Sequence, residues 1–208
     1  PKKVVPLRMA PLVLGATLIS HLFGASVGRE GTAVQMGGAL ADQFTHVLKL
    51  QPNDRRIILM AGISAGFASV FGTPLAGAVF GLEVLAIGRM RYDALLPCVA
   101  AALVADQICL LWGVHHSHYT VGSLPSITAW GLAAMALAGI VFGLAGRGFA
   151  WGTHSLGGLM KRWIPYAPLR PLLGGTVIAA AAWWLAADRY LGLGLPGIAQ
   201  AFESPVPA

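Results

Sequence analysis

The sequence predicts an all-α integral membrane protein, and three observations lead to this prediction. Of the 208 residues, 56% are hydrophobic and 11% are charged, whereas an average soluble domain carries about 25% charged residues. The hydrophobic residues form long runs, and Lys and Arg stand at the ends of these runs, as in membrane proteins. The net charge of +6 is scattered and forms no basic stripe, so no nucleic acid partner is expected.

The apolar runs divide the chain into seven candidate membrane segments. Two of them are too short for a simple crossing, which needs about 20 residues, and Gly72-Thr73-Pro74 separates these two. Short hydrophobic segments interrupted by Gly or Pro predict broken helices, whose ends form ion sites in transporters. The seven segments are 9–27, 31–48, 57–71, 74–88, 92–113, 127–150 and 171–187.

Glycine is abundant, with 27 residues, and several glycines lie four positions apart. Small residues at this spacing allow helix backbones to approach closely in lipid. We therefore expect close helix packing at three glycine pairs, which are Gly62–Gly66, Gly77–Gly81 and Gly139–Gly143.

The apolar segments predict a multi-pass membrane protein, which we expect in the cell inner membrane, and the basic residues predict its orientation in the bilayer. Arg89 and Arg91 lie before two consecutive crossings, and Lys161 and Arg162 lie after them. The connection between the two crossings, 113–127, contains no Lys or Arg. By the positive-inside rule, the basic flanks are cytoplasmic and the connection faces outward.

The strongest functional signal is Gly28-Arg29-Glu30-Gly31-Thr32, where one apolar segment ends and the next begins. An ionisable pair at membrane depth is costly and indicates a functional site. The glycines expose backbone N–H groups at the start of a helix, where the helix dipole favours an anion. Glu30 would compete with this anion when charged and leave the site when protonated. The alternative is a Glu30–Arg29 pair that only caps the helix.

Two longer motifs carry a family resemblance. Residues 28–38 read GREGTAVQMGG, and residues 61–83 read AGISAGFASVFGTPLAGAVFGLE. They resemble the GREGP…VQxGG signature and the AAGxAAGxAAxFxxPLAGxxFxxE block of the CLC family of chloride channels and anion/proton antiporters. The resemblance is strong over residues 1–93, and beyond them the hydropathy pattern carries it.

The resemblance implies a CLC-type bundle of broken, tilted helices, and a homodimer with one anion pore per subunit. It implies that chloride or fluoride and protons are transported, with Glu30 as the gating and proton-carrying glutamate. The residues that would line the anion path with backbone amides are Arg29, Glu30, Gly31 and Thr32. The residues with structural roles near the site are Gly28, Glu83 and Pro74.

Two departures from the family pattern affect the choice of ion. Thr32 replaces the signature proline, as in a bacterial subgroup that includes fluoride/proton antiporters. Its hydroxyl would supply a hydrogen-bond donor to the strongly hydrated fluoride ion. Val84 stands where many chloride/proton antiporters carry a second proton-relaying glutamate. Chloride and fluoride, and channel and antiporter, therefore stay open as alternatives.

The resemblance also concerns the extent of the chain. The family's serine loop, GxFxP loop and central tyrosine have no counterpart in residues 1–208. We therefore expect residues 1–208 to be part of a single transmembrane anion-transport domain, roughly its middle half, truncated at both ends.

The alternative function is an intramembrane serine protease-like enzyme. Residues 24–28 match G-x-S-x-G, with Ser26 as nucleophile and His21 or His46 as base. In serine hydrolases this motif follows a strand, and here it follows an apolar helix end. His21 also lies about 140° around a helix from Ser26. We therefore predict that the protein is not an enzyme and needs no cofactor.

A histidine cluster, His115-His116-Ser117-His118, interrupts the outward connection. It has no nearby carboxylate to support a metal ion. We expect a solvated polar loop there and no metal centre.

Overall fold

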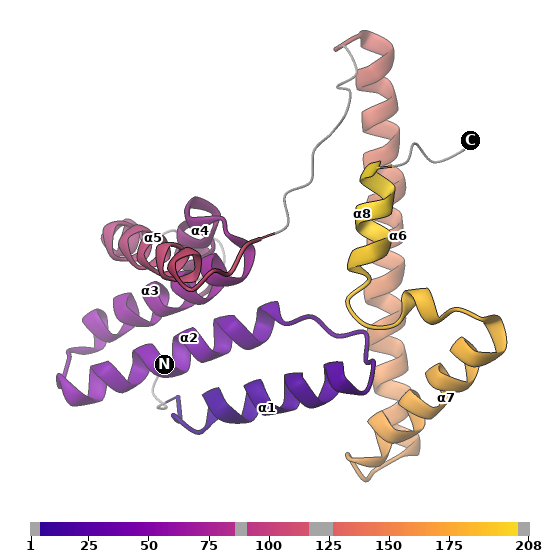
Figure 1. Ribbon diagram of the computed structural model, residues 1–208, viewed down its shortest axis with the longest axis horizontal. Coiled ribbons are helices and arrows are strands. Elements are labelled where there is room, and N and C mark those ends of the chain that lie inside the picture. Colours follow the sequence, from indigo (N-terminus) through magenta and orange to yellow (C-terminus); the bar gives the residue numbers. More distant parts are fainter. Residues whose placement is uncertain (1–4, 86–90, 117–126, 204–208) are drawn as a thin grey trace. The chain divides into compact units, whose positions relative to one another are not determined.

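The computed structural model describes residues 5–85, 91–116 and 127–203, and within these ranges the regular structure is entirely helical (Figure 1). The predicted all-α class is therefore confirmed. The chain divides into two compact units, Pro1–His118 and Tyr119–Ala208. The candidate site lies in the first unit.

The first unit contains five α-helices: α1 (Met9–Leu22), α2 (Glu30–Val47), α3 (Pro52–Phe71), α4 (Pro74–Val84) and α5 (Leu95–Leu111). A short 3₁₀ turn, η1 (Tyr92–Ala94), precedes α5. These helices follow the apolar segments predicted from the sequence. The predicted break at residues 72–74 is also present: Gly72 ends α3 with a left-handed φ of +65°, and Pro74 begins α4. Proline suits a first helical position, where no N–H bond is lost.

Helices α2 and α3 cross with their backbones in contact. A Cβ atom on Gly62 would clash with the carbonyl oxygen of Gly37, and one on Gly66 would clash with the carbonyl oxygen of Ala33. Glycine is therefore required here for space. The close packing predicted at Gly62–Gly66 is confirmed, and it holds the first turn of α2 against α3.

Helix α4 packs on the other side of α3. A Cβ atom on Gly77 or Gly81 would come within 3 Å of the carbonyl oxygens of Ser64 or Met60. Residues 60 and 64 lie two positions from Gly62 and Gly66, which is about 200° around the helix. The Gly77–Gly81 pair thus packs as predicted, on the face of α3 opposite to α2.

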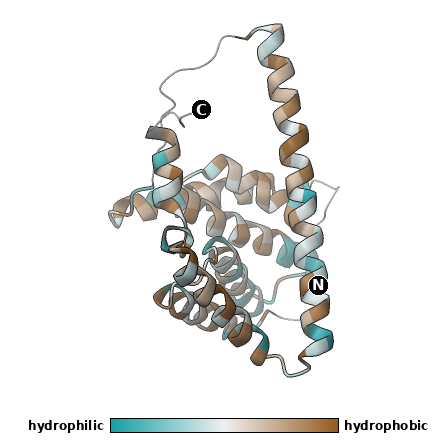
Figure 2. Cartoon of the chain, turned by 90° about the vertical axis from the view of Figure 1, so that its right-hand side faces the viewer, coloured by the Kyte–Doolittle hydropathy of each residue, from teal (hydrophilic) through white to brown (hydrophobic). Residues whose placement is uncertain are grey.

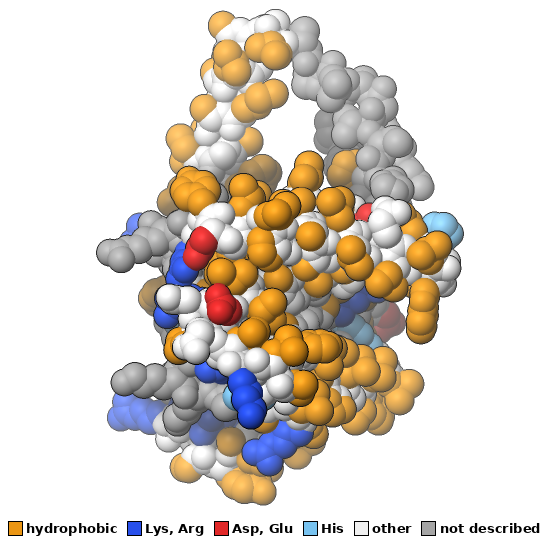
Figure 3. Space-filling view, turned by 90° about the vertical axis from the view of Figure 1, so that its left-hand side faces the viewer, with side chains coloured by type: hydrophobic (Ala, Val, Ile, Leu, Met, Phe, Trp, Pro, Cys, Tyr) orange, Lys and Arg blue, Asp and Glu red, His pale blue; other side chains and the backbone are white. Residues whose placement is uncertain are grey.

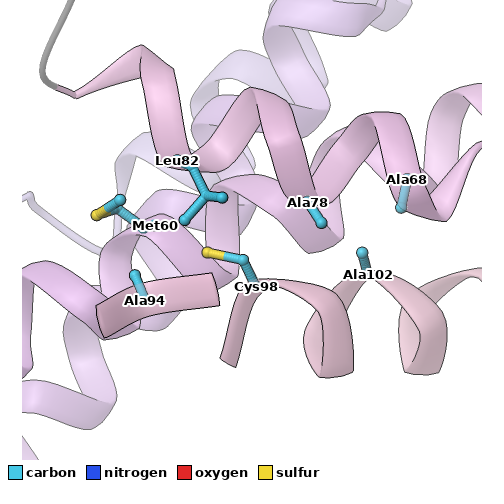
Figure 4. Close-up of a cluster of buried hydrophobic side chains, with 7 residues drawn as sticks. All are labelled: Met60, Ala68, Ala78, Leu82, Ala94, Cys98 and Ala102. Atoms are coloured by element: carbon cyan, nitrogen blue, oxygen red, sulfur yellow. The ribbon is translucent and has the colours of Figure 1, made fainter. Parts of the chain in front are cut away.

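Small side chains fill the core between α3, α4 and α5 (Figure 4). Met60 and Leu82 are its large members, and alanines let the three helices approach closely. Cys98 belongs to this core, and both cysteines are free thiols. The core residues are Met60, Ala68, Ala78, Leu82, Ala94, Cys98 and Ala102.

The second unit consists of α6 (Ala129–Trp163), α7 (Leu169–Leu185), a 3₁₀ turn η2 (Asp188–Tyr190) and α8 (Leu195–Glu203). Helix α6 has no buried residue. Its first part is strongly hydrophobic, and polar residues gather toward its Trp163 end (Figure 2). It continues 13 residues past the apolar segment predicted to end at 150 because its polar last part remains helical. The Gly139–Gly143 pair of α6 faces open space, so the packing expected there is not present in this structure.

Apolar side chains also dominate much of the exposed surface, as the face in Figure 3 shows. Trp130 and Phe142 of α6 are 83% and 73% exposed. Large apolar patches on a soluble monomer are rare and mark contact with a membrane or a partner. Two stretches of the described residues are long and apolar enough to cross a membrane, Tyr92–Leu111 and Ala129–Trp163.

Candidate functional site

The candidate site lies where α1 is followed by α2. Helix α1 ends at Leu22, and Gly24 turns the chain with a left-handed φ of +75°. Helix α2 then begins at Glu30, one residue before the start predicted from the sequence. Residues 28–32 therefore form the end of the connection and the first turn of α2.

The amino end of α2 has no side-chain cap. Arg29 occupies the N-cap position, and its side chain makes no capping hydrogen bond. The first helical bond in this turn runs from the N–H of Ala33 to the carbonyl of Arg29, at 3.2 Å. Among the hydrogen bonds of the described residues, none uses the N–H groups of Glu30, Gly31 or Thr32. These donors and the helix dipole make this end suited to an anion.

The Glu30 side chain folds back over Gly28. One of its carboxylate oxygens, Oε2, lies so close that a Cβ atom on Gly28 would clash with it, and Cδ lies 3.4 Å from the same point. The Glu30 side chain is half-buried. Within the described residues, no ion pair joins it to Arg29, so the helix-cap alternative is not what the structure contains. Gly28 thus leaves room for a carboxylate beside the free N–H groups.

Two side chains of α1 hold this segment. The hydroxyl of Thr17 hydrogen-bonds to that of Thr32, with 2.5 Å between the oxygens. One turn later, the Nε2 of His21 lies 2.9 Å from the carbonyl oxygen of Val27. Residues four apart share a helix face, so one face of α1 contacts the chain on both sides of Glu30.

The His21 contact bears on the protease alternative. A carbonyl oxygen only accepts hydrogen bonds, so the Nε2 of His21 is a donor to Val27 in this arrangement. His46 is in the last turn of α2, about 24 Å along the helix from Glu30. The segment before Ser26 is helix α1, not a strand. The geometry gives the protease no support.

The other two predicted site residues are on α4. Pro74 is the first residue of this helix, and Glu83 is exposed in its last turn. Because α2 and α4 pack on opposite faces of α3, the structure does not bring these residues to Glu30. Within the described ranges, no ion pair involves the Glu83 side chain, and its backbone carbonyl accepts the N–H of Leu85 at the end of α4.

Sequence reasoning missed a buried ion pair in the same unit. The carboxylate of Asp42 is fully buried and accepts two hydrogen bonds from Arg55, at 2.7 and 2.8 Å. It also accepts the N–H of Val5 at 2.7 Å, while Gln43 donates to the Val5 carbonyl at 3.0 Å. The network joins α2, α3 and the segment before α1. An acidic residue inside an apolar run was the signal for it.

The histidine connection is only partly the solvated loop that the sequence predicts. His115 is exposed, but His116 is half-buried and contacts the end of α3. Its ring lies where a Cβ of Gly72 would be, and its Nε2 is 3.0 Å from the carbonyl oxygen of Ser69. Among the described residues no group of three or more metal-ligating side chains occurs. His118 lies outside the described residues.

Comparisons with known proteins point to one family of anion channels and transporters. The family model described as "Voltage gated chloride channel" matches residues 1–208. A "Chloride/fluoride channel protein" from Pseudomonas syringae pv. tomato is 65% identical over 99% of this chain and 47% of its own length. An "H(+)/Cl(-) exchange transporter ClcA" from Vibrio cholerae is 32% identical over 59% of this chain and 27% of its own length.

A solved structure is similar to this chain over most of its length. The "Crystal structure of a CLC-type fluoride/proton antiporter" matches with a TM-score of 0.89 and 33% identity, over 97% of this chain and 51% of that one. The chain thus spans about half the length of the Pseudomonas protein and of the solved antiporter. All three relatives are named as channels or transporters.

Proposed function

The chain belongs to the voltage-gated chloride channel family, which matches it over residues 1–208, and we propose that it moves anions across a membrane through a site at the start of α2. The observation that carries this proposal is the first turn of α2, where free N–H groups and the Glu30 carboxylate lie together. The N–H groups would bind the anion, and the Glu30 carboxylate would occupy the position of the anion when no anion is bound.

Glu30 is the gate and the proton carrier in this proposal. A charged carboxylate competes with an anion for the same positive helix end. A protonated carboxyl group is neutral and leaves that end to the anion, so proton and anion movements become linked. Arg29, Gly31 and Thr32 contribute backbone N–H groups to the same anion path. Gly28 leaves space for the carboxylate, while Pro74 and Glu83 act structurally on α4.

The proposed anion is fluoride, exchanged for protons. The 65% identical relative is named as a chloride/fluoride channel and the solved structure as a fluoride/proton antiporter. Thr32 adds a hydroxyl in the first turn of α2, where the N–H groups are free. The surrounding assembly would be a homodimer in the bilayer of the cell inner membrane. Residues 1–208 would belong to a single transmembrane anion-transport domain. Chloride efflux clearly faster than fluoride efflux from liposomes would reject the fluoride assignment.

The test of the gate uses the full reading frame that encodes this sequence, purified and reconstituted in liposomes. We expect Glu30→Gln to abolish proton movement driven by an anion gradient, because the amide cannot ionise, while anion flux continues. The matched control is Asp54→Asn, an exposed carboxylate in the first turn of α3, which should keep normal coupling. Unchanged proton movement in Glu30→Gln would contradict the proposed role of Glu30.

A further inference from the structure

The hydroxyl pair Thr17–Thr32 links α1 directly to the first turn of α2. Thr17 is one of few polar residues in the apolar helix α1, and Thr32 is the third residue of α2. Both side chains are half-buried, and either oxygen can be the donor. Their contact places a second hydroxyl against the side chain of Thr32, a residue of the first turn of α2 whose own N–H is used by no hydrogen bond of the described residues.

Two hydroxyls contain two hydrogens, and one of these lies between the oxygens. If Thr17 donates to Thr32, the hydrogen of Thr32 is left for another acceptor. If Thr32 donates to Thr17, that hydrogen is used and Thr32 has none to offer. The direction of this single bond therefore decides whether Thr32 is a donor at the amino end of α2.

We propose that Thr17 is a positioning residue for anion selectivity, which donates its hydroxyl hydrogen to Thr32 so that the Thr32 hydroxyl donates to the bound anion. This inference rests on the proposed function. Hydrogen bonds in a chain polarise one another and strengthen the last donor, most of all in a low-dielectric site. Fluoride, a small ion with concentrated charge, gains more from a strong donor than chloride does.

The His21 contact supports this role for α1. His21 lies on the same face as Thr17 and reaches the carbonyl oxygen of Val27 at 2.9 Å. The two contacts hold the chain before and after Gly28 and Glu30. The segment between α1 and α2 is therefore held to α1 at two points, and these contacts fix the first turn of α2 relative to Thr17.

The experiment compares initial fluoride and chloride efflux from liposomes that contain the full-length protein. Thr17→Val keeps the shape of the side chain and removes the hydroxyl, and we expect it to lower the fluoride-to-chloride ratio roughly threefold to tenfold. Thr17→Ser restores the hydroxyl and should bring the ratio back to near the original. The matched control is Thr176→Val, since the Thr176 hydroxyl bonds only to the Leu172 carbonyl of its own helix among the described contacts.

A double variant tests the route of the effect. Thr32→Val should lower the ratio as Thr17→Val does, and adding Thr17→Val to it should change the ratio no further, because the chain of donors is already broken. A merely structural role of Thr17 would lower total flux of both anions and leave their ratio unchanged. If Thr17→Val does not fold, Thr17→Ala removes the same hydroxyl and takes its place.

Three results separate the two proposals. An unaltered ratio in Thr17→Val, or a further drop on adding it to Thr32→Val, overturns the role of Thr17. If Glu30→Gln uncouples protons although Thr17→Val leaves the ratio unaltered, the proposed function stands and only the role of Thr17 is lost. If the unaltered protein moves neither anion, the proposed function fails and the role of Thr17 fails with it.

Discussion

At the scale of single residues, Gly28 and Glu30 act as one unit. The carboxylate lies over Gly28 because this residue has no Cβ atom. The motif Gly28-Arg29-Glu30-Gly31 marked this position as a candidate site in the sequence, since an ionisable pair between glycines is unusual inside an apolar chain. The direction in which Glu30 points depends on side-chain packing and could not be predicted from the motif.

Replacing Gly28 tests this arrangement. In Gly28→Ala the new Cβ would force the Glu30 carboxylate into another rotamer, at a cost of about 1 kcal/mol. That energy changes the population of a side-chain position roughly fivefold. We therefore expect a change in the number of anions moved per proton, measured in liposomes, with little change in thermal stability.

The control is Gly15→Ala in α1, where nothing lies within 4 Å of the added Cβ. It should keep the original ratio. Equal numbers of anions moved per proton in both variants would show that the function of the Glu30 carboxylate does not depend on the space at Gly28.

A second prediction at this scale concerns Asp42. Removing one partner of a buried ion pair leaves the other charge uncompensated and costs about 3–5 kcal/mol. We expect Asp42→Ala to lower the thermal transition of the protein in detergent by several degrees, because Arg55 and the Val5 N–H lose their acceptor.

The comparison is Asp93→Ala, whose partner Arg91 lies in an exposed ion pair. Exposed pairs contribute little to stability, so this variant should melt close to the original temperature. A similar melting temperature for both variants would mean that the Asp42 network is not a stabilising contact.

At the scale of helices, spacing predicted where glycine allows close approach but not which helix approaches. Gly62 and Gly66 face α2, and Gly77 and Gly81 face α3, whereas no atom of the described residues lies within 4 Å of a Cβ added at Gly139 or Gly143. The same four-residue spacing therefore has three outcomes. They differ because a helix face acquires a neighbour only when the rest of the chain packs, which local sequence does not describe.

The crossing of α2 and α3 predicts the effect of Gly66→Ala. The added Cβ would clash with the Ala33 carbonyl, and overpacking of this kind costs about 1–3 kcal/mol. We expect a lower thermal transition in detergent and slower anion flux, since the first turn of α2 must move. Gly143→Ala, where the added Cβ meets open space, should be neutral or slightly stabilising. Equal stability of the two variants would argue against the tight crossing.

At the scale of the whole molecule, membrane orientation is a prediction from the basic residues. The connection after α5 faces outward in this prediction, and the Lys161 end of α6 faces the cytoplasm. We expect a single cysteine at His115, an exposed residue, to react with a membrane-impermeant thiol reagent in intact spheroplasts. The background for this test lacks Cys98 and Cys109.

The matched position is Lys161, which is exposed near the end of α6. A cysteine there should react only after the inner membrane is broken. The reverse labelling pattern would invert the orientation, and with it the side of the membrane from which Glu30 is reached.

The sequence alone determined the helical class, the helix segments, the break at residues 72–74 and the start of α2 to within one residue. These features depend on composition and on neighbours within a few positions, which a sequence contains. Only the tertiary structure decided the pairing of Thr17 with Thr32, the Asp42–Arg55 contact and the opposite faces of α3 that α2 and α4 occupy. These contacts join residues from 13 to 15 positions apart, or whole helices, and they form only when apolar faces pack and set the orientation of each helix.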